Sequence, residues 1–456
     1  MTLSQAAKIV DGVLTGDDVT FTAVATDTRQ LRGGELFVAL TGPNFDGHDF
    51  LERAGAAGAV AAMVNRSSET RIPFVTVQDT RLALGGLARH WRARMEIPLI
   101  AVTGSNGKTT VKEMIAAILR QTGRGLVSEG NLNNDIGVPV SLLRLRADDR
   151  FAVVEMGMNH AGEIDYLSRI AQPTIAVITN AAEAHLEGLG RIERVARAKA
   201  EIFNGLSTQG VAVLNADDTY VTLWQGLAAP RRCVTFGLAN SANVEASYQS
   251  CRGHTEISMS THRGQLDINL PLPGKHNVLN ALAAAAASLE AGVGLAHIKK
   301  GLERMKSVSG RLQQKQGLAG ARVFDDSYNA NPASLQAALE VLTAYSGERV
   351  LVLGDMAELG ISAARMHADI GRLAKELGVE QLLGVGDLTS LAVEAFGQGG
   401  RCFNEQSDLI RELKEMMHGR MTVLVKGSRR MGMERVVDAI CMNDGLPACS
   451  DDEMYH

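Results

Sequence analysis

Residues 99–110 read Leu-Ile-Ala-Val-Thr-Gly-Ser-Asn-Gly-Lys-Thr-Thr, and this stretch decides the fold. Its apolar start indicates a buried strand, and a glycine-containing turn leads from that strand into a helix predicted over 111–119. Backbone N–H groups of such a turn, the helix dipole and the ammonium group of Lys108 all attract phosphate. The hydroxyl of Thr109 is suited to ligate Mg²⁺ between two phosphates. We therefore predict a nucleoside triphosphate site formed by Gly104, Ser105, Asn106, Gly107, Lys108, Thr109 and Thr110.

The spacing of this loop is a variant of the usual phosphate-binding signature. Two residues separate Gly104 from Gly107, whereas the common signature has about four residues between its glycines. The alternative interpretation is a glycine-rich helix start that binds nothing. Because Gly-Lys-Thr-Thr follows directly on an apolar strand, we favour the nucleotide site.

The composition is that of a globular protein with several domains. A length of 456 residues suggests about two to four domains. The net charge of −5 and the absence of a basic run argue against a nucleic-acid partner. The five cysteines are scattered without metal-ligand spacing, as in a reduced cytoplasmic protein. No apolar run approaches the roughly 20 residues that span a bilayer, so we expect a soluble, cytoplasmic monomer without membrane insertion.

The chain divides into three α/β segments. Residues 1–96 alternate short strands with turns, and the helix predicted over 82–94 ends them. Residues 97–310 carry apolar runs at 99–102, 151–154, 175–178 and 211–214 with helical stretches between them, which indicates a parallel sheet covered on both faces. Residues 311–456 repeat this pattern with strands at 349–353, 381–385 and 422–425. We expect an α/β N-terminal domain, a central P-loop domain and a Rossmann-like C-terminal domain.

Two residues that follow central strands are candidate Mg²⁺ ligands. Glu155 ends the apolar run 151–154, and His185 lies in the loop after the next strand. The carboxyl ends of parallel strands meet at one edge of the sheet, where ligands bind in open α/β folds. The alternatives are a solvated loop acid and a hydrogen-bonding loop histidine. Together with Thr109, both residues fit a site for hard cations.

Lys199 lies on the inward face of a predicted helix. It falls four residues after Val195 and three before Ile202, both members of the apolar stripe. A lysine at such a position usually extends its ammonium group past the stripe to water. The other possibility is a desolvated amine, which reacts with CO₂ to give an anionic carbamate suited to hold Mg²⁺. The residues alone favour the first interpretation.

Four more polar residues stand at loops or helix starts. Asn277 precedes a helix predicted over 278–290, where it either caps the helix or contacts a base or ribose. Arg311 stands at the boundary between the last two segments, where it can reach a γ-phosphate. Asp326 binds a ribose or caps the helix that starts near Pro332. Lys426 begins a cationic loop that suits a carboxylate or phosphate.

Taken together, these motifs resemble the Mur ligase family over nearly the whole chain. The resemblance rests on residues 103–110, 153–157, 180–187, 196–202, 274–280, 310–312 and 325–332. Within that family, residues 155–159, 326–332, 354–360 and 426–431 are similar to those of members that add D-alanyl-D-alanine to UDP-N-acetylmuramoyl-tripeptide.

The resemblance implies ATP and Mg²⁺ as cofactors and a role for each candidate residue. Metal ligands would be Thr109, Glu155, His185 and a carbamylated Lys199. Asn277 and Asp326 would bind the nucleoside of ATP, and Arg311 its phosphates. The catalytic residues would be Lys108, His185, Lys199 and Arg311. Substrate contacts would come from Asp27, Thr28, Arg29, Gly47 and His48 for the uridine diphosphate end, and from Asn329, Asn331 and Lys426 elsewhere.

The resemblance also implies that a carboxylate is activated as an acyl phosphate and then attacked by an amine. Other possibilities are another amino-acid-adding Mur ligase, a folylpolyglutamate synthase-like ligase, or a regulatory nucleotide-binding module. The Tyr-Asn-Ala-Asn-Pro segment at 328–332 argues against the first two. A regulatory module would not need His185, Lys199 and Arg311 together.

Overall fold

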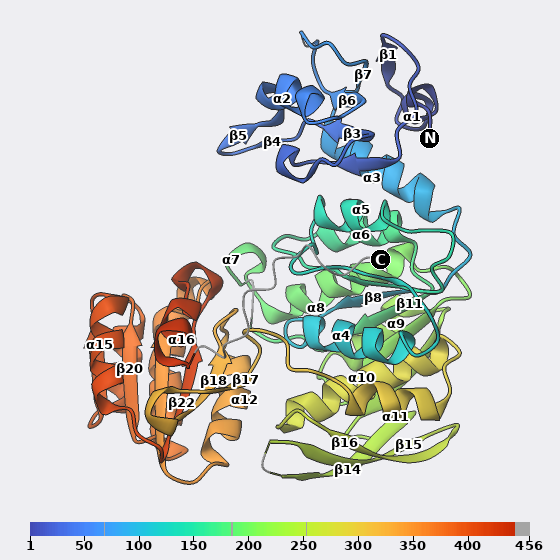
Figure 1. Ribbon diagram of the computed structural model, residues 1–456. Coiled ribbons are helices and arrows are strands. Elements are labelled where there is room, and N and C mark those ends of the chain that lie inside the picture. Colours follow the sequence, from blue (N-terminus) through green and yellow to red (C-terminus); the bar gives the residue numbers. More distant parts are fainter. Residues whose placement is uncertain (68, 184–185, 252, 443–456) are drawn as a thin grey trace.

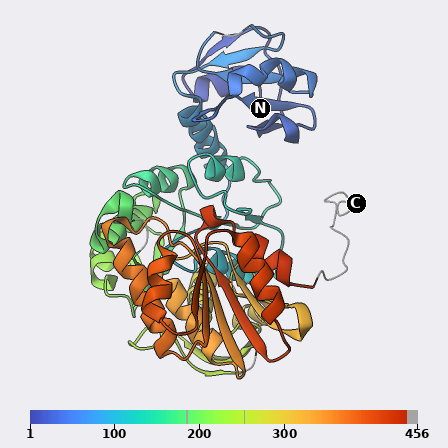
Figure 2. The ribbon, with the colours of Figure 1, turned by 90° about the vertical axis from the view of Figure 1, so that its left-hand side faces the viewer.

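Three separate β-sheets organise the chain, each with helices of its own (Figure 1). The computed structural model describes residues 1–67, 69–183, 186–251 and 253–442. The strands of each sheet all come from one of the three segments predicted from the sequence. In both ribbon views the N-terminal domain stands above the central one; the C-terminal domain lies to one side of the central domain in Figure 1 and in front of it in Figure 2.

The N-terminal sheet has five strands in the order β1-β7-β6-β3-β2, and β1 is its one antiparallel member. The strands are β1 (Val13–Thr15), β2 (Ala23–Ala25), β3 (Glu35–Val38), β6 (Ala61–Val64) and β7 (Phe74–Thr76), with a separate hairpin of β4 (Thr41–Gly42) and β5 (Phe45–Asp46). The helices are α1 (Leu3–Ile9), η1 (Thr28–Gln30), η2 (Gly47–Phe50), α2 (Leu51–Ala56) and α3 (Thr80–Arg92). The side chain of Asp79 caps α3, so this helix starts two residues before its predicted start.

The central sheet has nine strands in the order β16-β15-β14-β13-β12-β11-β8-β10-β9. Its strands are β8 (Leu99–Thr103), β9 (Leu126–Val127), β10 (Ala152–Glu155), β11 (Ile175–Ile178), β12 (Val211–Asn215), β13 (Arg232–Gly237), β14 (Val244–Ser250), β15 (Thr255–Thr261) and β16 (Gly264–Leu270). Its helices are α4 (Lys108–Leu119), α5 (Gly137–Leu142), α6 (Glu163–Ala171), α7 (Leu186–Leu189), α8 (Ile192–Ala200), η3 (Glu201–Gly205), α9 (Val221–Ala228), α10 (Lys275–Glu290) and α11 (Leu295–Glu303).

The parallel part of this sheet is covered on both faces, as the apolar runs predicted. In β8, Ile100 and Val102 pack into the core beneath α4, α10 and α11, whereas Leu99 and Ala101 pack into the core beneath α6 and α8. Strands β14–β16 extend the sheet with an antiparallel meander that the sequence analysis did not predict. Much of β15 and part of β16 alternate buried and exposed residues, and β14 is mostly exposed, so these strands lack the continuous apolar run that marked the parallel strands.

The C-terminal sheet has six strands in the order β17-β18-β22-β19-β20-β21, parallel except for β17. Its strands are β17 (Gln313–Gln316), β18 (Arg322–Asp326), β19 (Glu348–Gly354), β20 (Gln381–Val385), β21 (Gly400–Phe403) and β22 (Met421–Lys426). Its helices are η4 (Leu318–Gly320), α12 (Pro332–Thr343), η5 (Gly360–Ser362), α13 (Ala363–Glu376), α14 (Thr389–Phe396), α15 (Gln406–Met416), η6 (Arg429–Met431) and α16 (Glu434–Ile440). Among the described residues, none of the helices combines the length and the apolar character that a bilayer-spanning segment needs.

Candidate active site

The phosphate-binding turn lies between β8 and α4, and α4 begins at Lys108, three residues earlier than predicted. Two positions of this turn require glycine. A Cβ atom on Gly104 would lie 1.8 Å from Oγ1 of Thr179, and one on Gly107 would lie 2.3 Å from Oδ1 of Asn280. Gly107 also has a φ angle of +81°, which L side chains rarely adopt. The glycines therefore let the turn approach the neighbouring strand end and α10.

The side chain of Lys108 folds back over the backbone of the phosphate-binding turn. Its Nζ donates hydrogen bonds to the carbonyl oxygens of Gly104 (2.8 Å) and Ser105 (3.2 Å). Burial lowers the pKa of this lysine, and the charges of Glu155 and Glu358 act in the opposite direction. The ammonium group thus stands where a phosphate bound by the turn would meet it.

Thr109 and Glu155 meet at the strand edge as predicted. The Thr109 hydroxyl donates to Oε2 of Glu155 (2.9 Å), and the other carboxylate oxygen accepts from Nδ2 of Asn133 (2.9 Å). The side chain of Glu155 is buried in this polar pocket. Hydroxyl and carboxylate oxygens are ligands that Mg²⁺ prefers, so Thr109 and Glu155 fit the implied metal, and Asn133 orients the carboxylate. The sequence analysis missed Asn133.

His185, the third predicted metal ligand at this edge, lies outside the described residues, so its assignment stays a prediction. The described chain resumes at Leu186, where α7 begins.

Lys199 does not reach water, which contradicts the interpretation that the residues alone favoured. Its side chain is 1% exposed, and burial together with the charge of Lys108 holds its pKa well below the ordinary value. Helix α8 ends in the 3₁₀ turn η3, and the buried side chains of Ile202 and Phe203 close this side of the helix. The amine is therefore desolvated, which is the state that reacts with CO₂.

Asn277 is not a helix cap, although capping was one of its two predicted roles. Helix α10 begins earlier, with Gly274 as its N-cap, and the amide of Asn277 donates to the carbonyl oxygen of Pro273 (2.8 Å). Asn280 Nδ2 donates to Oδ1 of Asn277 (3.3 Å), so the two amides share one helix face as predicted. Burial lowers the pKa of the neighbouring His276 to about 4, which keeps this imidazole neutral.

Arg311 reaches from the start of the C-terminal domain into the central one. Its Nη2 donates to the hydroxyl of Thr109 (3.2 Å), and its guanidinium carbon lies 4.0 Å from the centre of the Tyr328 ring. Stacking on an aromatic ring fixes the plane of a guanidinium group. The guanidinium group of Arg311, which is the predicted phosphate contact, is therefore held in a fixed orientation beside the phosphate-binding turn.

Asp326 and Lys426 end two adjacent strands and form a buried ion pair. Asp326 also accepts from the backbone N–H of Leu312 (3.0 Å), and Lys426 donates to the carbonyl oxygen of Asn329 (3.0 Å). Asp326 is the last residue of β18 and does not cap α12. That cap is Asn331, so the capping alternative for Asp326 is wrong.

Asn331 joins the two larger domains. Its side-chain oxygen accepts from the backbone of Ser334 as the cap of α12, and its Nδ2 donates to Oδ1 of Asn106 (2.7 Å) in the phosphate-binding turn. In return, Nδ2 of Asn106 donates to Oδ1 of Asn331 (3.3 Å). A residue predicted as a substrate contact thus also links the domains.

Most of these groups line one cavity of about 840 Å³, whereas Gly104, Thr109 and Lys199 are not part of its lining. The N-terminal domain contributes Arg81 and Leu82 to its lining, and Arg81 pairs with Asp135 of the central domain (2.8 Å). Lining residues that the sequence analysis missed are Arg81, Asn133, Asn180, His276, Tyr328 and Glu358. Arg81 and Asn133 stand outside the quoted motifs, whereas the other four lie within or directly beside them.

The residues predicted for the uridine diphosphate end do not line this cavity. Asp27 accepts four hydrogen bonds from Arg29, whose side chain is largely exposed. His48 is buried, with its Nδ1 2.6 Å from Asp46 and its Nε2 accepting from the N–H of Asn65. Both nitrogens of this imidazole are therefore engaged within the protein.

Thr28 and Gly47 start the short 3₁₀ turns η1 and η2 of the same domain. A Cβ on Gly47 would lie 2.7 Å from backbone atoms of Leu40, so a side chain has no room at this position. All five predicted substrate contacts of the N-terminal domain stay predictions.

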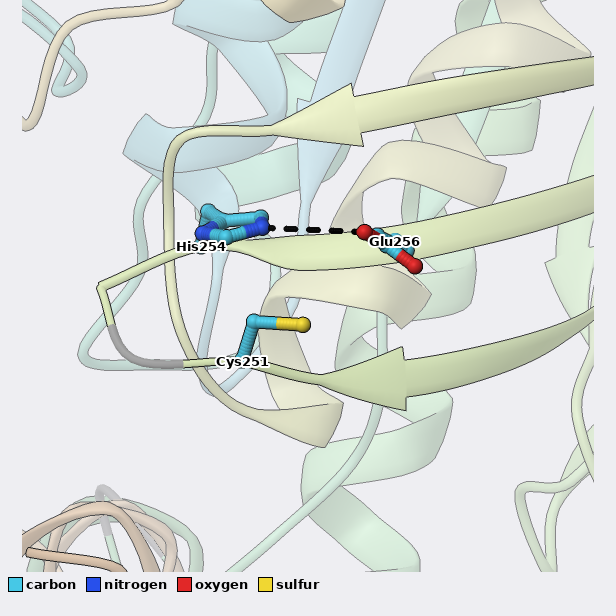
Figure 3. A group of neighbouring side chains, drawn as sticks. All are labelled: Cys251, His254 and Glu256. Atoms are coloured by element: carbon cyan, nitrogen blue, oxygen red, sulfur yellow. Dashed lines mark ion pairs between the residues drawn. The ribbon is translucent and has the colours of Figure 1, made fainter.

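A second group of polar side chains gathers away from the cavity, at the turn between β14 and β15 (Figure 3). Ligand atoms of Cys251, His254 and Glu256 lie within 4.8 Å of one another, and His254 forms an ion pair with Glu256 (3.9 Å). The spacing of the cysteines did not indicate this cluster, because two of its three members are not cysteines. It shares no residue with the cavity lining.

Three regions of the chain match descriptions of known domains. Residues 20–92 match the Mur ligase family catalytic domain, residues 102–288 the Mur ligase middle domain, and residues 310–429 the Mur ligase glutamate ligase domain.

Similar proteins cover nearly the whole chain. UDP-N-acetylmuramoyl-tripeptide–D-alanyl-D-alanine ligase of Escherichia coli is 46% identical over 97% of this chain and 99% of its own length. The enzyme of that name from Bacillus subtilis is 35% identical over 96% of this chain and 97% of its own length.

Among solved structures, MurF from Acinetobacter baumannii superposes with a TM-score of 0.90 at 37% identity, over 96% of this chain and 98% of its own. MurF from Thermotoga maritima in complex with ADP gives a TM-score of 0.80 at 26% identity, over 91% of this chain and 96% of its own. The chain belongs to the Mur ligase family and is an ATP-dependent ligase. Within that family, its full-length likeness is to the D-alanyl-D-alanine ligases named above.

Proposed function

We propose that this protein joins D-alanyl-D-alanine to UDP-N-acetylmuramoyl-tripeptide, with conversion of ATP to ADP and phosphate. This is a cytoplasmic step in the synthesis of peptidoglycan precursors. The observation that carries the proposal is the single cavity that the phosphate-binding turn, Arg311 and the buried Asp326–Lys426 pair surround. One chain supplies all of these groups, which supports a monomer as the active form.

The reaction has two chemical steps. The terminal carboxylate of the tripeptide attacks the γ-phosphorus of ATP, the bond to the β-phosphate oxygen breaks, and ADP leaves with that electron pair. The amine of the dipeptide then attacks the acyl carbon, loses a proton, and expels phosphate. Lys108 and Arg311 flank the phosphates and neutralise their charge, which is the main protein contribution to phosphoryl transfer.

Mg²⁺ would be held by Thr109 and Glu155, with Asn133 orienting the carboxylate, and by His185 and Lys199 if the family resemblance holds at those positions. When bound, the ion supplies positive charge to the phosphate oxygens. A carbamate on Lys199 forms when its neutral amine adds to CO₂ and releases a proton. The burial of this lysine supports that assignment.

The N-terminal domain would hold the uridine diphosphate end of the substrate, near Asp27, Thr28, Arg29, Gly47 and His48. Its helix α3 brings Arg81 to the cavity, which supports a substrate that extends from this domain to the reaction centre. Asn277 and Asp326 lie in the cavity lining, as their predicted role toward the nucleoside of ATP requires.

The test is ADP release from ATP and Mg²⁺ with UDP-N-acetylmuramoyl-tripeptide, with and without D-alanyl-D-alanine. We expect ADP only when the dipeptide is present, for a tripeptide ending in lysine or in diaminopimelate. Glutamate and diaminopimelate, offered as acceptors, separate this function from those of other Mur ligases and of folylpolyglutamate synthases. Activity with either single amino acid, or hydrolysis that needs no acceptor, would contradict the proposal.

A further inference from the structure

The cluster at the turn between β14 and β15 has no role in the ligase reaction, because none of its residues lines the cavity (Figure 3). It consists of Cys251, His254 and Glu256. Of the residues that the structure describes, only these three form a group of at least three histidine, cysteine or acidic side chains with their ligand atoms this close together. Thiol, imidazole and carboxylate are all metal-binding groups.

The hairpin itself brings these side chains together. Only two residues separate Cys251 from His254, and the second of them, Gly253, has a φ angle of +83°, as tight hairpin turns require. The backbone N–H of Cys251 donates to the carbonyl oxygen of His254 (3.0 Å), which sets these two residues opposite each other. Glu256 follows His254 by two positions, so it shares the same face of β15.

This face of β15 is turned away from the core. Thr255 and Ile257 are buried on the other face, whereas Glu256 between them is exposed. Cys251 and His254 are half-buried. In Figure 3 the side chains of His254 and Glu256 face one another along β15, and that of Cys251 comes from the end of the neighbouring strand. An ion can therefore reach the cluster from solvent.

The contacts of these side chains are long. Nε2 of His254 lies 3.9 Å from Oε1 of Glu256, and this ion pair needs a protonated imidazole. The Cys251 thiol lies 4.0 Å from the carbonyl oxygen of Gln249, which is long even for a sulfur donor. Partly exposed ion pairs stabilise a protein little, so these contacts allow the side chains to turn toward an ion.

We propose that Cys251, His254 and Glu256 bind a Zn²⁺ ion. Zn²⁺ takes sulfur, imidazole nitrogen and carboxylate oxygen as ligands, and a thiolate in the set disfavours Mg²⁺ and Ca²⁺. Tetrahedral Zn²⁺ bonds of about 2.0–2.3 Å place ligand atoms about 3.3–3.6 Å apart, so the cluster needs to contract by only about 1 Å. The thiol releases its proton to solvent as it becomes a ligand, and water takes the fourth position.

Cobalt provides a spectroscopic test, because Co²⁺ bound to a thiolate has a charge-transfer absorption that oxygen ligands do not produce. The reduced full-length protein, free of metal and of any affinity tag, is titrated with Co²⁺ and then with Zn²⁺. We expect one equivalent of Co²⁺ to bind with this absorption band and to be displaced by Zn²⁺, which such sites bind more tightly than Co²⁺. The band distinguishes the cluster from the predicted Mg²⁺ site, where no cysteine is a candidate ligand.

Two of the ligands have matched controls elsewhere in the chain. Cys251→Ser should abolish the charge-transfer band, whereas Cys402→Ser, which removes an exposed thiol of the C-terminal domain, should keep it. His254→Gln should weaken Zn²⁺ binding at least about 100-fold, because loss of even an outer partner of a metal ligand costs roughly 10- to 100-fold. His262→Gln, at an exposed position between β15 and β16, should bind Zn²⁺ as the wild type does.

The third ligand is tested in the same way. Glu256→Gln should weaken Zn²⁺ binding, because the amide keeps the shape of the side chain and loses the anionic oxygen. Glu245→Gln removes an exposed acid of β14 and is its control.

Zn²⁺ bound across the turn should also slow the opening of the hairpin. With Zn²⁺ at about ten times its Kd, we expect the amide hydrogens of β15 to exchange about tenfold more slowly, since opening releases the ion. Cys251→Ser should show no such slowing. Its ADP release should match that of wild type, because the cluster shares no residue with the cavity.

Several outcomes would overturn the Zn²⁺ site. Wild type could bind Co²⁺ without the charge-transfer band, or Cys251→Ser could keep that band. His254→Gln and Glu256→Gln could bind Zn²⁺ as tightly as wild type, or the three control variants could lose as much affinity as the three ligand variants. A wild-type protein without dipeptide-dependent ADP release would instead contradict the proposed function and leave the metal site unaffected.

Discussion

Single buried residues of the central domain owe their chemistry to desolvation. Lys199 and Lys108 have pKa values lowered mainly by desolvation, and each lies within the electrostatic reach of the other. Helix periodicity placed Lys199 on the inward face correctly. Periodicity does not show whether the ammonium group at the end of the side chain reaches water. In the structure it does not, because Lys199 is only 1% exposed.

Replacing Lys199 by Met should separate its two effects. We expect activity to fall at least about 100-fold, because the proposed metal-binding carbamate is lost. In CO₂-free buffer we expect the variant to be more stable than wild type at pH 7. The folded pKa of Lys199 lies below the 10.5 of the unfolded chain, so the unfolded wild type binds more protons between these values and its stability rises with pH.

The stability advantage of Lys199→Met should therefore shrink as the pH approaches about 10.5. Urea unfolding between pH 7 and 10 measures this difference. The matched control is Lys414→Met, which removes an exposed lysine near the end of α15. A constant difference across this pH range would contradict a buried neutral amine at position 199.

At the scale of elements, the carboxyl ends of the strands carry the site. Parallel pairing of β10 with β8 brings Glu155 beside the phosphate-binding turn, and pairing of β18 with β22 sets Asp326 against Lys426. Strand ends can be read from apolar runs, so these residues were predicted. The loop after β19 was recognised only as a turn, because its role depends on α13 and α14 packing against it.

Helix α13 should control that loop through His367. The imidazole is fully buried, its Nδ1 lies 2.7 Å from the carbonyl oxygen of Ala363, and its Nε2 accepts from Met356. His367→Phe leaves the N–H of Met356 without this acceptor, so we expect a loss of about 1–3 kcal/mol in the free energy of unfolding.

The pH dependence of stability provides an independent check. Burial lowers the pKa of His367 below its ordinary value of 6.5, so the unfolded chain binds the proton more readily. Wild type should lose stability as the pH falls below about 6.5, and His367→Phe should lack that part of the loss. Urea unfolding at pH 5 and 7 measures it. An equal pH dependence in both proteins would show that this imidazole does not titrate on unfolding.

For the whole molecule, function depends on how three domains, each built on a sheet of its own, meet. The C-terminal domain contacts the central one through Arg311 and Thr109, through Asn331 and Asn106, and through the carbonyl oxygen of Glu358. Acyl phosphates hydrolyse readily, so we expect closure of the C-terminal domain over this cavity to exclude water. We expect the domains to separate when such contacts are removed.

Asn331→Ser tests this expectation. Serine keeps a good cap for α12 but is too short to reach Asn106, so two hydrogen bonds are lost, each worth about 0.5–1.5 kcal/mol. We expect a larger radius of gyration in small-angle X-ray scattering without ligands, and a return toward the wild-type value with ATP and UDP-N-acetylmuramoyl-tripeptide. Asn404→Ser, at an exposed position of the same domain, is the control. Identical radii for Asn331→Ser and wild type would show that this pair does not hold the domains together.

The sequence by itself determined the phosphate-binding turn, the parallel strands and the acids at their ends, because each depends on a local pattern of apolar residues, glycines and charges. Only the tertiary structure showed that Lys199 is shielded from water, that Asn133 and Arg81 line the cavity, and that Asn331 links two domains. It also extended the central sheet with β14–β16, whose many exposed residues carry no signal of a buried parallel strand. Burial and contact between distant segments depend on how whole elements pack, and no local stretch of residues records that packing.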